Sequence, residues 1–396
     1  MREAVHERSA KRPLLWIAIP ILGIPSEIWQ LRQIYGLVSF DSEILTWGDW
    51  RDPDAHAGLT VHMCPGPNPA LPAETGPKKW ARRLLRLPDC NFMAAPRGEV
   101  AALRHLAARR RPAAALCHFG FIGLRMLPVA RGLGIPLAVH FHGIDLSGSL
   151  RNRWYRWSLL AHMNRFDAMI AVGSQQRDWL LEYGADPAKV HLIPCGAPIR
   201  SFTRSRPLTF DPVRFITVSR LHAQKGVDVN LRAFARIADD LPGARMTIVG
   251  DGPERGALED LAAQLGLGDR VTFTGNLPPE GVRAALEDAS IFLQHSLDHE
   301  GWYEGFGVSL TEAMAMGLPA IVSACGGLLD QVTDGETGLV CPQRDVDVVA
   351  AAMLRIATDE ALARRLGEAG RVTALAHFDT ERQIYKLEKM LLGLLN

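Results

Sequence analysis

Short apolar runs alternate with longer amphipathic segments along nearly the whole chain, and this alternation starts twice. Runs such as 14–19 and 213–219 have the length and the Val, Ile and Leu content of buried strands, and segments with helical spacing of apolar residues follow them. Alternating strands and helices fold into parallel sheets covered by helices on both faces. The pattern therefore predicts an α/β protein, and its restart near residue 213 predicts two Rossmann-like domains facing each other across a cleft.

The same pattern predicts the boundaries of the elements. The expected strands are 14–19, 42–47, 59–63, 113–119, 135–141, 167–172, 190–193, 213–219, 244–249, 271–274, 290–294, 320–322 and 338–340. The expected helices are 29–37, 99–110, 125–133, 175–183, 226–238, 254–265, 280–288, 308–316, 345–356, 359–375 and 378–395. Three prolines mark 197–212 as the linker. We therefore expect domains at 1–200 and 201–377, and a last helix, 378–396, that packs back on the first domain.

Charge is spread unevenly over the 396 residues. Residues 1–200 carry 25 Lys and Arg against 16 Asp and Glu, a net charge of +9, and the remainder carries −8. A basic half suits an anionic membrane, an anionic substrate or nucleic acid, and the alternative is an ordinary solvated surface. Two basic segments, 78–87 and 151–166, also contain tryptophan. Segment 78–87 is partly amphipathic, so it suits a membrane surface or simply packs on its own core.

The N-terminus resembles a signal peptide only superficially. Acidic Glu3 and Glu7 precede the apolar run 14–22, and Pro20 interrupts it. No apolar run reaches the roughly 20 residues that a membrane helix needs. The six cysteines show no C-x-x-C pair and no regular spacing, which indicates free thiols in a reducing compartment.

One stretch, 304–323, carries the strongest sign of chemistry. Gly305 and Gly307 allow a backbone to pass close to a ligand, and the helix expected after them offers N–H groups to an anion. Glu304 and Glu312 frame this turn, so carboxylates could hold sugar hydroxyls while the helix start holds phosphate. That combination suits a nucleotide sugar. The alternative is that Ser309 and Glu312 form a capping box and Glu304 is an exposed loop acid.

Other turns follow predicted strands in the second half. Arg220 and Lys225 follow the first of these strands, and two cations beside a helix start suit a diphosphate. Gly250 and Gly252 form a tight turn that could pass close to a base or ribose. Gly326 and Gly327 form another turn at the same edge. Each turn alone is weak support.

Their ordered combination resembles a known family. The motifs are Ser219-Arg-Leu with Lys225-Gly, Val249-Gly-Asp-Gly-Pro, Val271-Thr-Phe-Thr-Gly275, Glu304-Gly-Phe-Gly, Glu312-Ala-Met-Ala-Met-Gly-Leu-Pro and Gly335-Glu-Thr-Gly-Leu339. They look like those of the retaining glycosyltransferases of family 4, which have the GT-B fold. Pro25-Ser-Glu27, His118-Phe-Gly120, His140-Phe-His-Gly-Ile-Asp145 and Ala171-Val-Gly-Ser174 resemble the bacterial exopolysaccharide and colanic-acid members.

This resemblance implies roles for individual residues. The first domain would bind the acceptor and the second the nucleotide-sugar donor. The implied catalytic residues are Glu304, His142, Arg220 and Lys225. The implied donor-binding residues are Arg220, Lys225, Gly250, Gly252, Gly305, Phe306, Gly307, Val308 and Glu312. The implied acceptor-binding residues are Gly23, Ser26, Glu27, His118 and Asp145. Glu312 would bond the ribose, and Glu304 and His142 the donor sugar.

The chain also departs from the family pattern. Gly326-Gly-Leu-Leu-Asp330 replaces a more usual Gly-Gly-x-Pro-Glu, so that loop is expected to differ in shape, and the bulky Trp302 and Tyr303 are expected to narrow the sugar pocket. His140 and His142 share one face of a strand near His118. Without a thiol or carboxylate to complete a ligand set, we expect no metal.

We therefore expect a retaining, metal-independent glycosyltransferase without a cofactor. Its expected partners are a nucleotide-sugar donor, a saccharide or lipid-linked saccharide acceptor in exopolysaccharide or cell-surface polysaccharide synthesis, and an anionic membrane surface, with no nucleic acid. The expected location is the cytoplasm, including the cytoplasmic face of the inner membrane. The alternatives are a non-catalytic nucleotide- or sugar-binding scaffold and a nucleotide-sugar epimerase of the same fold. Donor turnover, with or without an acceptor, distinguishes them.

Overall fold

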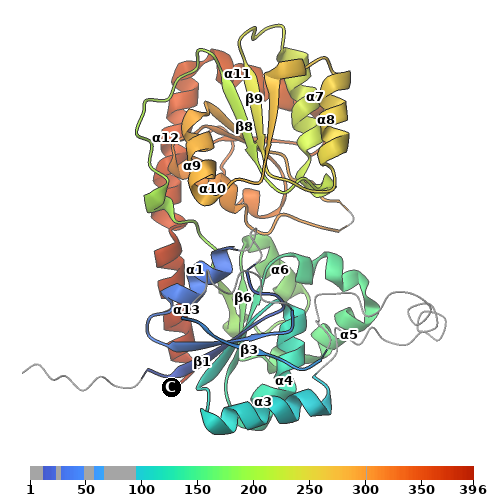
Figure 1. The fold of residues 1–396 in the computed structure, drawn as a ribbon, viewed down its shortest axis with the longest axis vertical. Coiled ribbons are helices and arrows are strands. Elements are labelled where there is room, and N and C mark those ends of the chain that lie inside the picture. Colours follow the sequence, from blue (N-terminus) through green and yellow to red (C-terminus); the bar gives the residue numbers. More distant parts are fainter. Residues whose placement is uncertain (1–11, 24–27, 49–57, 67–94, 300) are drawn as a thin grey trace, which may run out of the picture. The chain divides into compact units, whose positions relative to one another are not determined.

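The structure, a computed structural model, describes residues 12–23, 28–48, 58–66, 95–299 and 301–396 (Figure 1). The chain divides into two compact units. The first unit comprises Met1–His140, Asn152–Met169 and Ile384–Asn396, and the second comprises Phe141–Arg151 and Ile170–Gln383. The second unit thus includes residues 141–151 and 170–192, which belong to strands of the first sheet or follow them.

The first sheet has the strand order β3-β2-β1-β4-β5-β6-β7. Its strands are β1 (Leu14–Ile19), β2 (Asp41–Thr46), β3 (Thr60–Met63), β4 (Ala114–His118), β5 (Leu137–Phe141), β6 (Ala168–Ala171) and β7 (Val190–Leu192). The accompanying helices are α1 (Ile28–Gly36), α3 (Arg97–Arg109), α4 (Gly120–Leu133), α5 (Arg153–His162) and α6 (Ser174–Glu182). β1 pairs in parallel with both β2 and β4, and β4 pairs in parallel with β5.

The second sheet has the order β10-β9-β8-β11-β12-β13, and its neighbouring strands are parallel. Its strands are β8 (Arg214–Val218), β9 (Arg245–Val249), β10 (Val271–Gly275), β11 (Ile291–Gln294), β12 (Ala320–Ser323) and β13 (Leu339–Cys341). The helices are α7 (Val227–Ile237), α8 (Arg255–Gln264), α9 (Pro279–Asp288), α10 (Val308–Ala315), α11 (Val346–Thr358), α12 (Glu360–His377) and α13 (Thr380–Gly393). Two parallel sheets, each with helices, confirm the predicted α/β class.

Most predicted elements agree with the structure to within two residues, and α4 is the clearest exception. It begins at Gly120, whereas the sequence pattern suggested Arg125. Nearly the whole helix is buried, so its first turns show no polar face and no helical period in the sequence. Phe119 adopts a φ of 74° directly before the helix, which turns the chain sharply at the end of β4.

The second sheet buries both faces because consecutive side chains of a strand point to opposite sides. On β8, Phe215 packs on one face with Phe234 of α7, at 5.6 Å between ring centroids. The next residue, Ile216, belongs to the core on the other face, with Met314 of α10. Continuous apolar strands of this kind are typical of parallel sheets covered on both sides.

The C-terminal residues contact segments distant in sequence. Gly36 packs closely on Ile384, because a Cβ added to Gly36 would lie 2.5 Å from a side-chain carbon of Ile384. The Ser39 backbone N–H donates a hydrogen bond to the Glu388 carboxylate at 2.5 Å. The expected linker is hydrogen-bonded at its first residue. The Ala197 N–H donates to the Phe378 carbonyl at 2.9 Å, and the Ala197 carbonyl accepts from the Thr380 N–H at 3.0 Å.

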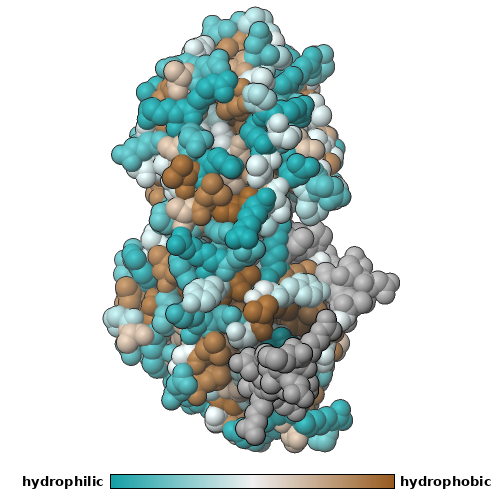
Figure 2. All heavy atoms as spheres, turned by 90° about the vertical axis from the view of Figure 1, so that its left-hand side faces the viewer, coloured by the Kyte–Doolittle hydropathy of each residue, from teal (hydrophilic) through white to brown (hydrophobic). Residues whose placement is uncertain are grey.

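Exposed large apolar side chains are distributed over several elements. They include Trp157 on α5, Val372 on α12 and Tyr385 on α13. On the face shown in Figure 2, hydrophobic residues form small patches separated by hydrophilic ones. In the described part of the chain, we find no helix with the length and apolar character required to cross a bilayer.

His295, directly after β11, makes folding stability dependent on pH. The side chain is buried, its Nε2 accepts from the Arg344 backbone at 3.1 Å, and burial together with the Arg344 charge lowers its pKa from 6.5 to about 4. Between these two pKa values the unfolded chain binds a proton that the folded chain rejects.

We therefore expect stability to fall as the pH drops from about 6.5 towards 4, by up to about 1.4 kcal/mol per pH unit from this group. Urea unfolding at pH 7, 6 and 5 measures this slope. A His295→Gln variant keeps an acceptor but cannot titrate, so its slope should be shallower. Equal slopes for both proteins would contradict a depressed pKa.

Candidate active site

Five turns of the second unit lie against one another, and each follows the carboxyl end of a strand. They are 142–145 after β5, 173–176 after β6, 219–225 after β8, 304–307 after β11 and 326–331 after β12. Ligands of open parallel sheets bind beyond the carboxyl ends of the strands. The contacts among these turns therefore define the candidate site.

The Glu304 carboxylate is buried and heavily bonded. Its side chain is 10% exposed, and that of Lys225 is 16% exposed. Lys225 Nζ forms an ion pair with Oε2 of Glu304. The same oxygen accepts a hydrogen bond from Ser296 Oγ at 2.7 Å and another from Gln294 Nε2 at 3.1 Å. The alternative that Glu304 is an exposed loop acid is therefore wrong.

These bonds determine the ionisation state of Glu304. Burial opposes ionisation, but the Lys225 charge and the hydrogen bonds from Lys225, Ser296 and Gln294 outweigh it and hold the pKa of Glu304 below its ordinary value. Glu304 is therefore an anion at neutral pH. It can accept hydrogen bonds from a ligand but cannot donate a proton to one.

Backbone packing explains the glycines around Glu304. A Cβ on Gly305 would lie 2.8 Å from the His142 carbonyl oxygen. A Cβ on Gly326 would lie 2.1 Å from the Glu304 carbonyl oxygen, and one on Gly327 would lie 2.3 Å from that of Gly305. The turn that carries Glu304 is thus enclosed between two other turns at distances that only glycine permits.

Helix α10 begins immediately after this turn without a side-chain cap. Gly307 is the N-cap in a left-handed conformation, with φ 79°, and Val308 is the first helical residue. Ser309 lies inside the helix, and its hydroxyl donates to Gln294 Oε1 at 3.4 Å, so the capping-box alternative does not describe this helix. Glu312 is buried, at 8% exposure. The first N–H groups of α10 form a start suited to an anion.

The other predicted donor-site residues lie nearby. Arg220 is exposed in the turn after β8, and Lys225 ends the short helix η9 (Ala223–Lys225). A Cβ on Gly250 would lie 1.9 Å from the Ser219 carbonyl oxygen, and one on Gly252 would lie 2.3 Å from that of Leu221. These two glycines therefore let the β9 turn pack on the β8 turn.

Phe306 points into the protein. It is 4% exposed and meets Phe378 edge-on, at 5.6 Å between ring centroids. Neighbouring Tyr303 makes a similar contact with Trp179 of α6, at 4.9 Å, and the Trp302 ring packs on Gly148. The three aromatic side chains around Glu304 thus pack against the second unit itself.

His142 and Asp145 form one structural unit. The buried Asp145 accepts a hydrogen bond from the His142 backbone N–H at 2.9 Å, which closes the turn after β5. The His142 ring is partly exposed, and its Nδ1 lies 4.0 Å from Cys195 Sγ. Asp145 therefore shapes the backbone beside Glu304, and the acceptor role that the resemblance implied for it stays a prediction.

The remaining predicted acceptor residues belong to the first unit. Gly23 follows β1 with a φ of 82°, whereas Ser26 and Glu27 lie outside the described residues. His118 is fully buried at the end of β4, with ring centroids 5.5 Å from Trp29 and 5.6 Å from His140.

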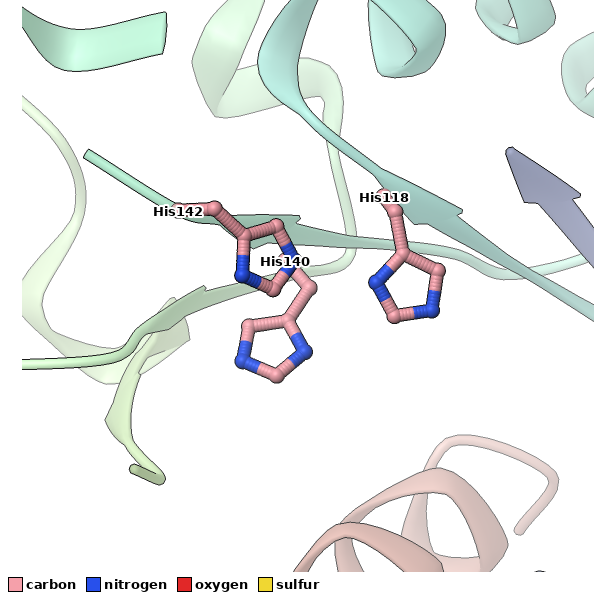
Figure 3. A group of neighbouring side chains, drawn as sticks. All are labelled: His118, His140 and His142. Carbon is pink, nitrogen blue, oxygen red and sulfur yellow. The ribbon is translucent and has the colours of Figure 1, made fainter. Parts of the chain in front are cut away.

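Three imidazoles gather at the ends of β4 and β5. Figure 3 shows His118 on β4, and His140 and His142 where β5 ends. One ring nitrogen of each lies within 4.8 Å of the others, and the group includes no carboxylate of the described residues. Burial and the neighbouring His140 hold the pKa of His118 well below its usual value, so this ring is neutral. Neutral imidazole is the metal-binding form, but the absence of a metal stays a prediction.

Several contacts of the site were not predicted from the sequence. Ser174 donates its backbone N–H to the Asp330 carboxylate at 2.7 Å and its hydroxyl to the same group. Gln294 ends β11 and Ser296 follows it, so both could have been found as polar residues at the carboxyl end of a strand. Gln176 and Gln331 could not, because their roles depend on contacts between distant segments.

Comparison with known proteins supports these motifs. Residues 55–200 match the family described as Glycosyltransferase Family 4, and residues 202–373 match Glycosyl transferases group 1. A putative colanic acid biosynthesis glycosyltransferase, WcaL, of Salmonella typhimurium is 32% identical over 60% of this chain. The amylovoran biosynthesis glycosyltransferase AmsK of Erwinia amylovora is 30% identical over 65% of it. These matches span 59% and 65% of the relatives' own lengths.

Solved structures show the fold. Anabaena HepE in complex with UDP has a TM-score of 0.78 at 17% identity, covering 96% of this chain and 100% of that one. A sucrose-phosphate synthase from Thermosynechococcus elongatus has a TM-score of 0.76 at 23% identity, covering 97% and 99%. Together with the two parallel sheets, these similarities confirm the GT-B architecture predicted from the motifs.

The buried ion pair yields a stability prediction. Lys225→Met should lower the free energy of unfolding by about 3 kcal/mol, because removing one partner leaves the Glu304 charge buried without a cation. The double variant Lys225→Met/Glu304→Gln should recover part of this loss, since it removes both charges. Urea denaturation at pH 7 measures the three variants.

A matched control is Arg255→Met, which breaks exposed pairs with Asp251 and Glu259 and should change stability little. A Lys225→Met variant as stable as the wild type would show that the Glu304 carboxylate does not need this ammonium in the folded protein.

Proposed function

The chain belongs to the family 4 glycosyltransferases, and from this premise we propose that it transfers a sugar from a nucleotide-diphosphate sugar to an acceptor hydroxyl. The anomeric configuration of the sugar is retained. The observation that carries this proposal is an ionised, buried Glu304 placed directly before the uncapped start of α10 and paired with Lys225. Glu304, which would accept hydrogen bonds from sugar hydroxyls, thus lies beside Lys225 and the α10 N–H groups, which would bind a diphosphate.

The proposed chemistry follows from charge. Breaking the bond between the anomeric carbon and the phosphate oxygen leaves negative charge on the diphosphate and positive charge on the sugar ring. Arg220, Lys225 and the first N–H groups of α10 stabilise the leaving diphosphate. Lys225 serves two groups at once, because an ammonium has three donors and Glu304 uses one of them.

Two carboxylates hold the rest of the donor. The bonds from Lys225, Ser296 and Gln294 all end on Oε2 of Glu304, so we assign Oε1 to a hydroxyl of the donor sugar. Glu312, inside α10, bonds the ribose. The partly exposed His142 ring contacts the donor sugar from the turn after β5.

In the proposed transfer step, the acceptor oxygen attacks the anomeric carbon on the face that the diphosphate leaves. The bond to the phosphate oxygen breaks, and that oxygen takes the acceptor proton. No covalent enzyme intermediate and no metal is needed for this balance. An α-configured donor then yields an α-configured product.

Similar proteins support a nucleotide-sugar donor without selecting the base. HepE structures contain UDP, UDP with glucose, and UDP-glucose, whereas a 32% identical mannosyltransferase of Mycolicibacterium smegmatis is named as GDP-mannose-dependent. Both donors share the diphosphate and the sugar, which are the parts that the Glu304 turn and Lys225 would hold.

The first test is a panel of nucleoside diphosphates and nucleotide sugars, read by thermal shift and by donor turnover in EDTA. A donor at about 100 times its dissociation constant should add roughly 2.7 kcal/mol of stability. Turnover should persist in EDTA. Activity that is lost in EDTA and restored by Mg²⁺ or Mn²⁺ would contradict the metal-free step.

Glu312→Gln separates the ribose role from a structural one. It should raise the donor KM while leaving the melting temperature nearly unchanged. An unchanged KM together with lower stability would remove Glu312 from the donor site.

We further propose a lipid-linked saccharide acceptor in exopolysaccharide synthesis, reached at a membrane surface. WcaL and AmsK are named for colanic acid and amylovoran biosynthesis. The basic first half carries +9, and helix α5 exposes Arg153, Arg156 and Trp157, the last at 59%. Exposed tryptophan beside arginine suits the boundary between lipid headgroups and acyl chains. Segment 78–87, also predicted to be basic and amphipathic, lies outside the described residues.

Sedimentation with vesicles tests the membrane proposal. Wild-type protein should bind anionic vesicles at low salt, because each Lys or Arg near such a surface contributes roughly 1 kcal/mol. It should dissociate from them at high salt, because salt screens this attraction. Arg156→Glu/Trp157→Ser should weaken this binding. The matched control, Tyr385→Ser/Lys389→Glu, removes a basic-aromatic pair of α13 and should not. Equal binding to neutral and anionic vesicles would contradict the membrane proposal. The proposed sugar transfer does not depend on this result.

A further inference from the structure

We propose that the side-chain amides of Gln331 and Gln176 are positioning residues that fix successive peptide planes of the turn 304–307, and that Asp330 holds Gln176 in place through helix α6. This inference rests on the proposed function, in which that turn holds the sugar and diphosphate of the donor. Neither glutamine is assigned a contact with the substrate.

Three consecutive carbonyl oxygens of the turn each accept a hydrogen bond from outside it, two of them from 326–331 and one from α6. The Glu304 oxygen accepts from the Gly327 backbone at 2.9 Å. The Gly305 oxygen accepts from Gln176 Nε2 at 3.4 Å, and the Phe306 oxygen accepts from Gln331 Nε2. One donor is a backbone group, and the other two are side chains that a substitution can remove.

Fixing a carbonyl also fixes the next N–H. A peptide unit is planar and trans, so its C=O and N–H point in opposite directions. The three donors therefore set the directions of the N–H groups of Gly305, Phe306 and Gly307. The two glycines impose little restriction of their own on the backbone, so the orientation depends on these external donors.

Gln331 is suited to this task by its burial and its bonds. It is 2% exposed, its Oε1 accepts from the Thr311 hydroxyl at 2.6 Å, and its Nε2 faces the carbonyl oxygens of Phe306, Gly307 and Gly327. Because Thr311 belongs to α10, the amide links the turn to the helix that follows it. A hydrocarbon side chain of similar size would fill the space but would remove the side-chain donor of the Phe306 carbonyl.

Gln176 depends on a second contact. It is fully buried in the first turns of α6, and the N-cap of that helix, Gly173, offers no side chain. The Asp330 carboxylate replaces the missing cap by accepting both the backbone N–H and the hydroxyl of Ser174. A carboxylate from the turn after β12 therefore fixes the helix start that presents Gln176 to Gly305. This is the function of the altered loop sequence noted at Gly326–Asp330.

Gln331→Met and Gln176→Met test the proposal with two readouts. Amide hydrogen exchange of 304–308 should accelerate at least tenfold, which requires no substrate. With UDP-glucose as the donor, kcat for donor turnover should fall at least tenfold while KM changes less than threefold, because a misplaced peptide affects the transition state more than binding. Gln383→Met is the matched control, since Gln383 is also 2% exposed and donates to the His377 carbonyl.

Ser174→Ala and Asp330→Asn test the link through α6. Each should lower kcat, and the double variant should be no worse than the more severe single variant, because Ser174→Ala removes one of the two hydrogen bonds that Asp330→Asn weakens. Asp330→Glu should restore part of the activity. Asp359→Asn makes the same substitution at the side-chain cap of α12, where Asp359 accepts from the Leu362 backbone, and should leave kcat unchanged.

The outcomes separate the two proposals. Unchanged exchange in Gln331→Met, or accelerated exchange with wild-type kcat, would overturn the positioning role. If the wild type neither binds nor turns over any donor of the panel, the proposed function fails, and the exchange measurement alone decides whether these amides hold the turn.

Discussion

The ion pair between Glu304 and Lys225 is the interaction on which the rest of the site depends. A carboxylate with 10% of its side chain exposed is costly unless a cation and hydrogen-bond donors surround it. Lys225 supplies the charge from the turn after β8, and Ser296 and Gln294 supply donors from the end of β11. Turns that follow two neighbouring strands must therefore keep a fixed spacing, which the parallel pairing of β8 with β11 provides.

Glycine packing imposes a second constraint. Charges held this closely leave no room for side chains between the turns, and the carbonyls of Glu304 and Gly305 approach Gly326 and Gly327 to distances that exclude a Cβ. The cost is conformational freedom, since glycine does not restrict its own backbone. Buried amides and a carboxylate then supply the restriction from outside, through Gln176, Gln331 and Asp330. The buried Glu304 anion thus requires a nearby cation, the cation requires closely packed turns, and the glycines of those turns require hydrogen bonds from outside.

Much of the fold was predictable from the sequence, because strand and helix periods and glycine turns are local signals. β1 was predicted at its observed boundaries, and α4 failed at its start because a fully buried helix shows no polar face. For the site, the Glu304 turn and Lys225 stood out as residue types in a recognisable order. Their direct pairing was not predictable, since 79 residues separate them. The Ser174–Asp330 contact spans 156 residues, so a loop departure at Asp330 had no visible partner in the sequence.

The ion pair also bears on how a donor enters. In the proposed mechanism a diphosphate approaches a site that already contains the Glu304 anion. Without Lys225 the two negative groups would repel each other across a short, poorly screened distance. With it, the Glu304 anion is neutralised before the donor binds, and the remaining ammonium donors, Arg220 and the start of α10 would meet the incoming charge. In this mechanism Lys225 stabilises the folded protein before binding and the leaving group during transfer, so we expect a substitution there to affect stability and rate together. Arg220, exposed near the start of the same turn, should affect the rate alone.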